Sequence, residues 1–169
     1  AISSIKKTQA LFKKLGVGSF ASIIGRFYAL DRDNRWDRIE AAYKLITEAE
    51  GVYVYKDPFT ALAEAYSRGE TDEFISATSI QSSGKKKVKI NDQDAVIFMN
   101  FRPDRARELT RALVGGQDFE GFKRSVVKDM SNFVMTTEYE AGLDQACAFP
   151  PQKFKNSLGQ YLSKKNRRQ

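Results

Sequence analysis

Histidine is absent from this sequence, and cysteine occurs once, at Cys147. Without histidine the chain cannot build a Ser-His-Asp triad, a Cys-His dyad, a histidine metal ligand or a histidine proton shuttle. A single cysteine excludes an internal disulfide and a zinc site made of cysteines alone. Any chemistry here must therefore use arginine, lysine, carboxylates or hydroxyls, or depend on groups outside the chain.

Long apolar runs are also missing. The longest are short, such as residues 95–99, whereas a membrane-spanning helix needs about 18 apolar residues or more. No charged-then-apolar stretch typical of a signal peptide opens the sequence, and we expect none. We therefore expect a cytoplasmic protein with no membrane partner. The first residue is Ala1 rather than methionine, and we expect a processed or excised piece of a longer protein.

Positive charge is abundant. The 169 residues include 28 Lys and Arg against 21 Asp and Glu, for a formal net charge of +7. This balance favours an anionic partner, which could be nucleic acid, acidic lipid or a phosphorylated metabolite. Net charge does not choose among them, and part of the excess lies in residues 164–168, a run typical of a solvated chain end.

Apolar residues recur at helical spacing in several stretches, separated by runs typical of strands. The expected helices cover residues 5–15, 36–46, 58–68, 103–114, 119–126 and 154–161, and the expected strands cover 19–25, 52–55, 74–80, 95–101 and 132–139. An exposed hairpin turn is expected at 82–84. The nearly continuous apolar run 95–101 predicts a strand covered on both faces. Strands alternating with helices predict an α/β protein, a layered α/β/α sandwich with a mixed, partly parallel sheet.

Two adjacent prolines mark the best candidate for a domain boundary. Phe149 precedes Pro150 and Pro151, and two fixed φ angles favour an extended, semi-rigid linker. An ordinary loop inside one domain fits the same residues equally well.

Arginine concentrates in two segments that follow predicted strands. In the first, Arg26 comes directly after the strand and Arg32 follows six residues later. That spacing puts the two on different faces of any helix, so they converge only if the segment is a folded loop. Interleaved aspartates, Asp31 among them, leave open a solvated loop that is held by ion pairs.

The second arginine segment follows the apolar run, at the end of a sheet where α/β proteins bind ligands. We expect Arg102 beside the N-cap of a helix, with Pro103 at its first position and Arg105 leaning over the same terminus. The positive end of a helix favours an anion, and two guanidiniums can grip phosphate or carboxylate oxygens. Surface pairing of these arginines with Asp104 and Glu108 is the open alternative.

Five segments occur in a fixed order along the chain: ASIIGRFYALDRDNRWDRIEAAY, TDEF, DAVIFMNFRPDRARELTRA, MTTEY and FPP. Together they closely resemble the family of cofactor-independent phosphoglycerate mutases, from the opening helix to the tail. The departures are mild: Phe27 stands where tyrosine is usual, and Ala77 where a proline often follows TDEF. The larger departure is length, because the family enzyme is about three times as long.

The resemblance implies that this chain is most of the family's inserted phosphotransferase domain. Residues 1–148 would form this substrate-binding domain, truncated on its N-terminal side, and residues 149–169 a hinge and the start of the phosphatase-like domain. The serine nucleophile, a substrate lysine and the ligands of two Mn²⁺ ions would lie outside this chain. The resemblance therefore implies no catalytic residue and no metal site here, no bisphosphoglycerate cofactor, and no activity for this piece alone.

The resemblance also assigns a substrate site. The positions that match the family's substrate-binding motifs are Arg26, Arg32, Arg102, Pro103, Asp104 and Arg105. The implied reaction interconverts 3-phosphoglycerate and 2-phosphoglycerate through a phosphoserine intermediate. The implied partners are phosphoglycerate and the remaining phosphatase-like domain of the same chain, in an intact monomer.

Interpretations from other classes stay open at this point. The net charge permits a basic nucleic-acid-binding module, and the arginines alone would serve a small-anion-binding module without catalysis. The sequence has no recognition-helix pattern, glycine-rich RNA motif or aromatic-basic strand pattern. We therefore expect no nucleic-acid partner.

Overall fold

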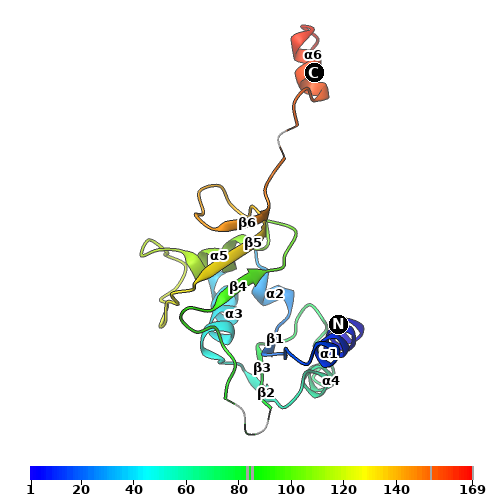
Figure 1. The fold of residues 1–169 in the computed structure, drawn as a ribbon, viewed down its shortest axis with the longest axis vertical. Helices are drawn as coiled ribbons and strands as arrows, with labels where there is room; N and C mark the ends of the chain where they lie inside the picture. The colour runs from blue at the N-terminus through cyan, green and yellow to red at the C-terminus, as the bar shows by residue number, and fades with distance from the viewer. Residues whose placement is uncertain (83, 85, 153, 169) are drawn as a thin grey trace.

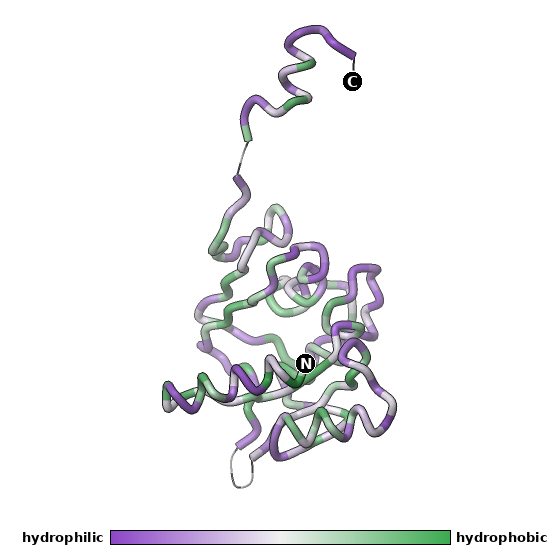
Figure 2. The backbone as a smooth tube through the Cα atoms, turned by 90° about the vertical axis from the view of Figure 1, so that its right-hand side faces the viewer, coloured by the Kyte–Doolittle hydropathy of each residue, from purple (hydrophilic) through white to green (hydrophobic). Residues whose placement is uncertain are grey.

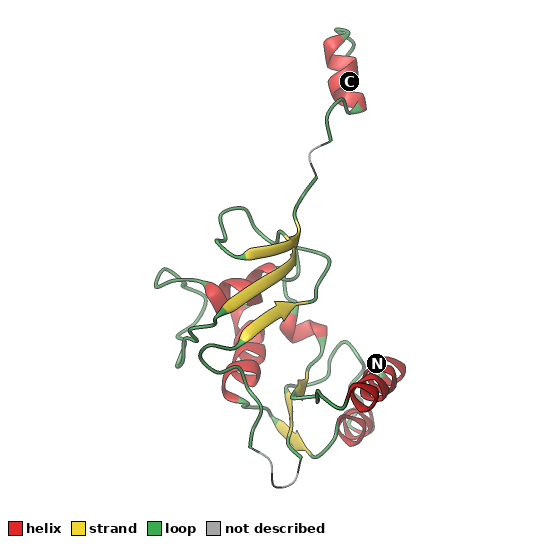
Figure 3. Ribbon diagram, in the orientation of Figure 1, coloured by secondary structure: helices red, strands yellow, loops and turns green. Residues whose placement is uncertain are grey.

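A computed structural model describes residues 1–82, 84, 86–152 and 154–168. Within these residues the chain forms six helices and six strands (Figure 1, Figure 3). In chain order they are α1 (Ile2–Leu15), β1 (Ser22–Ile23), α2 (Arg26–Ala29), α3 (Trp36–Glu48), β2 (Tyr53–Tyr55), α4 (Pro58–Ser67), β3 (Thr78–Ile80), β4 (Ala95–Phe98), α5 (Arg107–Val114), β5 (Asn132–Thr137), β6 (Ala146–Phe149) and α6 (Leu158–Lys164). The predicted hairpin turn contains Ser83, which lies outside the described residues.

The strands form two three-stranded sheets. In the first, the order is β1-β3-β2, with β3 antiparallel to β1 and parallel to β2. In the second, the order is β4-β5-β6 and both pairs are parallel. The predicted α/β class with partly parallel strands is confirmed, and the strands are divided between two sheets.

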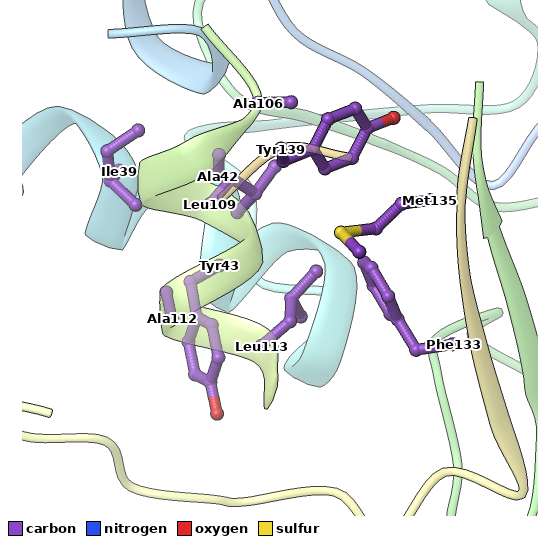
Figure 4. Close-up of a cluster of buried hydrophobic side chains, with 10 residues drawn as sticks. All are labelled: Ile39, Ala42, Tyr43, Ala106, Leu109, Ala112, Leu113, Phe133, Met135 and Tyr139. Atoms are coloured by element: carbon purple, nitrogen blue, oxygen red, sulfur yellow. The ribbon is translucent and has the colours of Figure 1, made fainter. Parts of the chain in front are cut away.

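The main core lies between α3, α5 and one face of the second sheet. Figure 4 shows Phe133 and Met135 of β5 pointing toward the helices, where Leu109 and Leu113 meet them from α5. The buried residues of this cluster are Ile39, Ala42, Tyr43, Ala106, Leu109, Ala112, Leu113, Phe133, Met135 and Tyr139. Burying a large apolar side chain contributes about 1.5–3 kcal/mol, so this cluster fixes α3 and α5 beneath the loops that carry the arginines.

Helices α1 and α4 pack together in a second, smaller cluster with Ile5, Leu62 and Ile75. The end of α1 at Leu15 and the start of α4 at Pro58 lie where the sequence predicts them. Asp57 Oδ1 caps α4 by accepting hydrogen bonds from the N–H groups of Phe59 and Thr60, both at 2.9 Å, and α1 ends at a left-handed glycine. These boundaries depend on capping by one or two neighbouring residues, which can be recognised in a sequence.

The prediction that β4 is covered on both faces is wrong. The side chains alternate along the strand, and Ile97 is 64% exposed, Met99 81% and Phe101 76%. Val96 and Phe98, on the other face, pack against the main core. Parallel sheets are normally covered on both faces, but the helices in the described part of this chain cover only one.

The prediction of a helix over residues 119–126 is also wrong, because this segment is a loop. Its place is fixed by tertiary contacts in which Phe119 packs edge-to-face on Trp36, with ring centroids 5.3 Å apart. Arg124 donates hydrogen bonds to the carbonyl oxygens of Gly115 at 2.6 Å and Gly116 at 2.5 Å. The segment thus caps the C-terminal end of α5.

The C-terminal segment stands apart from the rest of the chain. In Figure 1 α6 lies away from the two sheets, beyond β6, a strand that the sequence did not predict. Hydrophobic and hydrophilic residues mix along this segment in Figure 2, and Phe154 and Leu158 are 80% and 74% exposed. That residues 149–169 begin a further domain stays a prediction.

Candidate functional site

Arg26 opens α2, a short helix that the sequence did not predict. The helix is held against the TDEF segment, because the N–H of Gly25 donates to Ile75 O at 2.7 Å and the N–H of Phe27 to Glu73 O at 3.0 Å. A Cβ on Gly25 would lie 2.3 Å from Glu73 O, so only glycine permits this approach. The Arg26 Nε donates to Glu73 Oε1 at 3.2 Å, and both side chains remain about half exposed.

The segment between α2 and α3 is a folded loop, organised by one aspartate. Asp31 is only 4% exposed, and its Oδ2 accepts hydrogen bonds from the N–H groups of Asp33 at 2.8 Å and Arg35 at 3.0 Å. Burial raises the pKa of Asp31, but these two hydrogen bonds and the charges of Arg38 and Arg35 outweigh it, so the pKa lies below its ordinary value. Asp31 thus stays ionised and shapes the loop that presents Arg32.

Two direct links join the first arginine segment to the second. Arg32 Nη1 donates to Asp104 Oδ2 at 3.0 Å, across 72 residues of sequence. Arg105 Nη1 donates to the carbonyl oxygen of Leu30 at 2.9 Å, across 75 residues. The hydrogen bond from Arg32 is the main reason that the pKa of Asp104 is lowered. Of the predicted residues, Arg32, Asp104 and Arg105 are therefore brought together by direct contact.

The helix that follows the second arginine segment begins later than predicted. The N–H of Ala106 donates to Pro103 O at 3.1 Å, which closes residues 103–106 into a turn, and α5 starts only at Arg107. The proline thus opens a turn rather than the helix. Arg102 lies before this turn, exposed, and the described residues offer its guanidinium neither an ion pair nor a hydrogen bond.

Comparisons with known proteins identify the family. Residues 1–141 match the family described as BPG-independent PGAM N-terminus. The chain belongs to this mutase family. Two relatives are named 2,3-bisphosphoglycerate-independent phosphoglycerate mutase. The one from Hahella chejuensis is 53% identical over 160 residues, covering 95% of this chain and 31% of the relative, and the one from Yersinia pseudotuberculosis is 48% identical over 169 residues, covering 100% and 33%.

A solved structure, of Leishmania mexicana phosphoglycerate mutase at low cobalt concentration, matches with a TM-score of 0.82 at 23% identity. The match covers 96% of this chain and 31% of the Leishmania mexicana chain. At this sequence identity, the structural likeness shows the fold. The family match and the two relatives confirm the resemblance to cofactor-independent phosphoglycerate mutases. This chain spans about a third of the length of the curated relatives that it matches.

Tyr139 supports the strand end that leads to Arg102, a role that spacing did not reveal. Its side chain is fully buried. Its hydroxyl lies 2.6 Å from Phe98 O and 2.8 Å from Asn100 O, and it accepts the N–H of Asn100 at 3.3 Å. The only signal in the sequence is that Tyr139 closes the MTTEY segment of the family resemblance. This buried hydroxyl fixes the path by which the chain leaves β4.

Glu108 is the second supporting residue that sequence reasoning missed. Surface pairing with the arginines was the open alternative for it, but the side chain is 3% exposed and faces the loop of the first arginine segment. Its Oε1 accepts the N–H of Asn34 at 3.0 Å. Burial is the main cause of its raised pKa, and the nearby Asp31 raises the pKa further. No spacing rule separates such a residue from a solvated helix glutamate.

The described residues supply no site for a resident metal ion. They contain no group of three or more His, Cys, Asp or Glu side chains placed to hold one. This chain's residues therefore do not fit the two Mn²⁺ ions that the resemblance implies, and the location of those ions stays a prediction. Among the same residues, no helix is long and apolar enough to cross a membrane.

Proposed function

We propose that this chain is the substrate-binding part of a phosphoglycerate mutase that interconverts 3-phosphoglycerate and 2-phosphoglycerate. The substrate would be held by Arg26, Arg32, Arg102 and Arg105, with Pro103 and Asp104 lining the site. The observation that carries the proposal is the pair of links between the two arginine segments, Arg32 to Asp104 at 3.0 Å and Arg105 to Leu30 O at 2.9 Å.

The arginines suit a ligand that carries a phosphate and a carboxylate. Guanidinium groups bind both anions through two parallel hydrogen bonds and keep their charge near neutral pH. Arg102 is exposed and unpaired with the described residues. The ion pair of Arg32 with Asp104 is about half exposed, at 53% and 41%, and such pairs contribute little to stability because solvent screens them. A dianionic phosphate would therefore displace Asp104 from Arg32 at little cost.

In the proposed reaction the phosphoryl group moves from the 3-hydroxyl oxygen to a serine in the rest of the enzyme, and then from that serine to the 2-hydroxyl oxygen. The arginines of this chain would hold glycerate while it reorients between the two transfers. They would also offset the negative charge of the transition state. The serine, the two Mn²⁺ ions and a substrate lysine would belong to the remaining phosphatase-like domain, so this chain alone would be inactive.

The full proposal includes a cytoplasmic, monomeric intact enzyme without a bisphosphoglycerate cofactor. Its test compares two proteins in a coupled assay with Mn²⁺ and 3-phosphoglycerate: the full-length enzyme that contains this chain, and the 169-residue chain alone. We expect turnover only from the full-length enzyme. Sustained turnover by the highly purified 169-residue chain would contradict the division of labour proposed here.

A further inference from the structure

A buried carboxyl group lies beneath the loop that presents Arg32. Glu108 projects from the first turn of α5 and is 3% exposed. One of its oxygens, Oε1, accepts the N–H of Asn34 at 3.0 Å. The other, Oε2, is the buried side-chain oxygen that has no hydrogen-bond donor in the described part of the chain. A buried oxygen without a partner is costly and calls for an explanation.

The surroundings of Glu108 supply an acceptor instead of a donor. Burial raises the pKa of Glu108, and the negative charge of the nearby Asp31 raises it further. Asp31 already accepts hydrogen bonds from two backbone N–H groups and from Arg38 Nη1 at 3.2 Å, all of which favour its charged form. Asp31 therefore stays ionised and offers Glu108 no donor. The charged groups that act on this pair are Asp31, Asp33, Arg35, Arg38 and Arg111.

We infer that Glu108 is a positioning residue, whose buried Oε1 accepts the N–H of Asn34 and thereby ties the loop bearing Arg32 to α5. Asn34 has a φ of 58°, a left-handed conformation that asparagine tolerates better than most residues. The bond holds the loop at Asn34, close after Arg32 in the chain. Arg105, three residues before Glu108, reaches the same loop at Leu30 O.

This inference rests on the proposed function, because it assumes that Arg32 contacts phosphoglycerate. The test uses the full-length enzyme and steady-state kinetics. Glu108→Gln keeps an acceptor for the N–H of Asn34, and we expect its KM within about twofold of the parent enzyme. Glu108→Leu keeps the apolar volume but not the bond to Asn34, and we expect KM to rise about tenfold, the effect of one lost hydrogen bond, with kcat changing less.

A matched control separates positioning from general destabilisation. Leu113→Ala removes a buried side chain at the other end of α5. It should lower the melting temperature yet leave KM unchanged. Should Glu108→Leu fail to fold, Glu108→Asp takes its place, because its side chain is one methylene shorter and its carboxyl cannot reach Asn34 in the same geometry. We expect about a fivefold rise in KM, somewhat less than the loss of a full hydrogen bond.

A double-mutant cycle with Arg32→Ala decides whether Glu108 acts through Arg32. In the Arg32→Ala background, Glu108→Leu should add less than about twofold to KM, because the effects of coupled residues are not additive. A full additional tenfold rise, or a Gln variant as impaired as the Leu variant, overturns the positioning role. If Arg32→Ala itself leaves KM unchanged, the proposed function fails as well. If Arg32→Ala raises KM and neither Glu108→Leu nor Glu108→Asp does, only the role of Glu108 is refuted.

Discussion

Removing the guanidinium of Arg102 should separate substrate binding from stability. The described residues give this side chain no ion pair or hydrogen bond, so Arg102→Ala removes nothing that holds the fold. In the proposed site the same change removes one preorganised cation from the substrate's anionic groups. We expect kcat/KM of the full-length enzyme to fall about 100-fold or more, or roughly 3 kcal/mol, with the thermal melt unchanged.

Arg111 provides the matched control, since it is also an arginine and lies on the helix that follows. Its Nε and Nη2 donate to Glu140 at 2.7 and 2.5 Å, and the two side chains are 40% and 29% exposed. After allowance for solvent screening, such a pair is worth about 1 kcal/mol. Arg111→Ala should therefore lower the free energy of unfolding by about that amount and leave kcat/KM nearly unchanged.

The assay is steady-state kinetics together with a thermal melt for each variant. Arg102→Lys is a further test, because an ammonium group cannot reproduce the planar two-point grip and should restore kcat/KM only in part. The reasoning is refuted if Arg102→Ala and Arg111→Ala lower kcat/KM alike, or if Arg102→Ala destabilises the protein more than Arg111→Ala does.

Three other variants test the structure around the site. Tyr139→Phe should lower the free energy of unfolding by about 1–3 kcal/mol in denaturant titrations, because buried groups lose the partner hydroxyl; an unchanged midpoint would contradict its role. Cys147→Ser should leave KM within about threefold, because the half-buried thiol packs on the core, although it should cost about 1–3 kcal/mol of stability if the new hydroxyl is unpaired; a stable variant that lost binding would show a functional thiol. The raised pKa of Glu108 means that its contribution to stability is present below the ordinary value of 4.5 and lost as pH rises through the raised value. Glu108→Gln should therefore gain stability relative to the parent as pH rises above 4.5 in unfolding titrations; a difference that stays constant with pH would contradict the raised pKa.

Features with a local cause could be predicted from the sequence. Asp57 followed by Pro58 indicates the start of α4, and Gly16 indicates the end of α1. Both signals are local, because capping depends on one or two residues. The α/β class follows from the alternation of periodic and apolar stretches. The spacing of apolar residues wrongly predicted a helix over residues 119–126. The aromatic side chains of this loop pack on other elements, and Arg124 caps α5.

The candidate site depends on contacts that spacing does not record. Spacing left open whether Arg26 and Arg32 converge, and only the family resemblance placed both in one site. The links from Arg32 to Asp104 and from Arg105 to Leu30 join residues more than 70 positions apart. The apolar run through β4 predicted two covered faces, whereas in the described residues one face is open, since an apolar sequence does not say which segment covers it.

A crystal structure of the full-length enzyme with bound 3-phosphoglycerate tests the central claim most directly. The account predicts guanidinium nitrogens of Arg26, Arg32, Arg102 and Arg105 within hydrogen-bond distance of the phosphate or carboxylate oxygens of the substrate. It also predicts that Asp104 has given up its ion pair with Arg32 or shares Arg32 with the ligand. A substrate bound elsewhere, with Arg32 still paired to Asp104 alone and Arg102 in solvent, would contradict it.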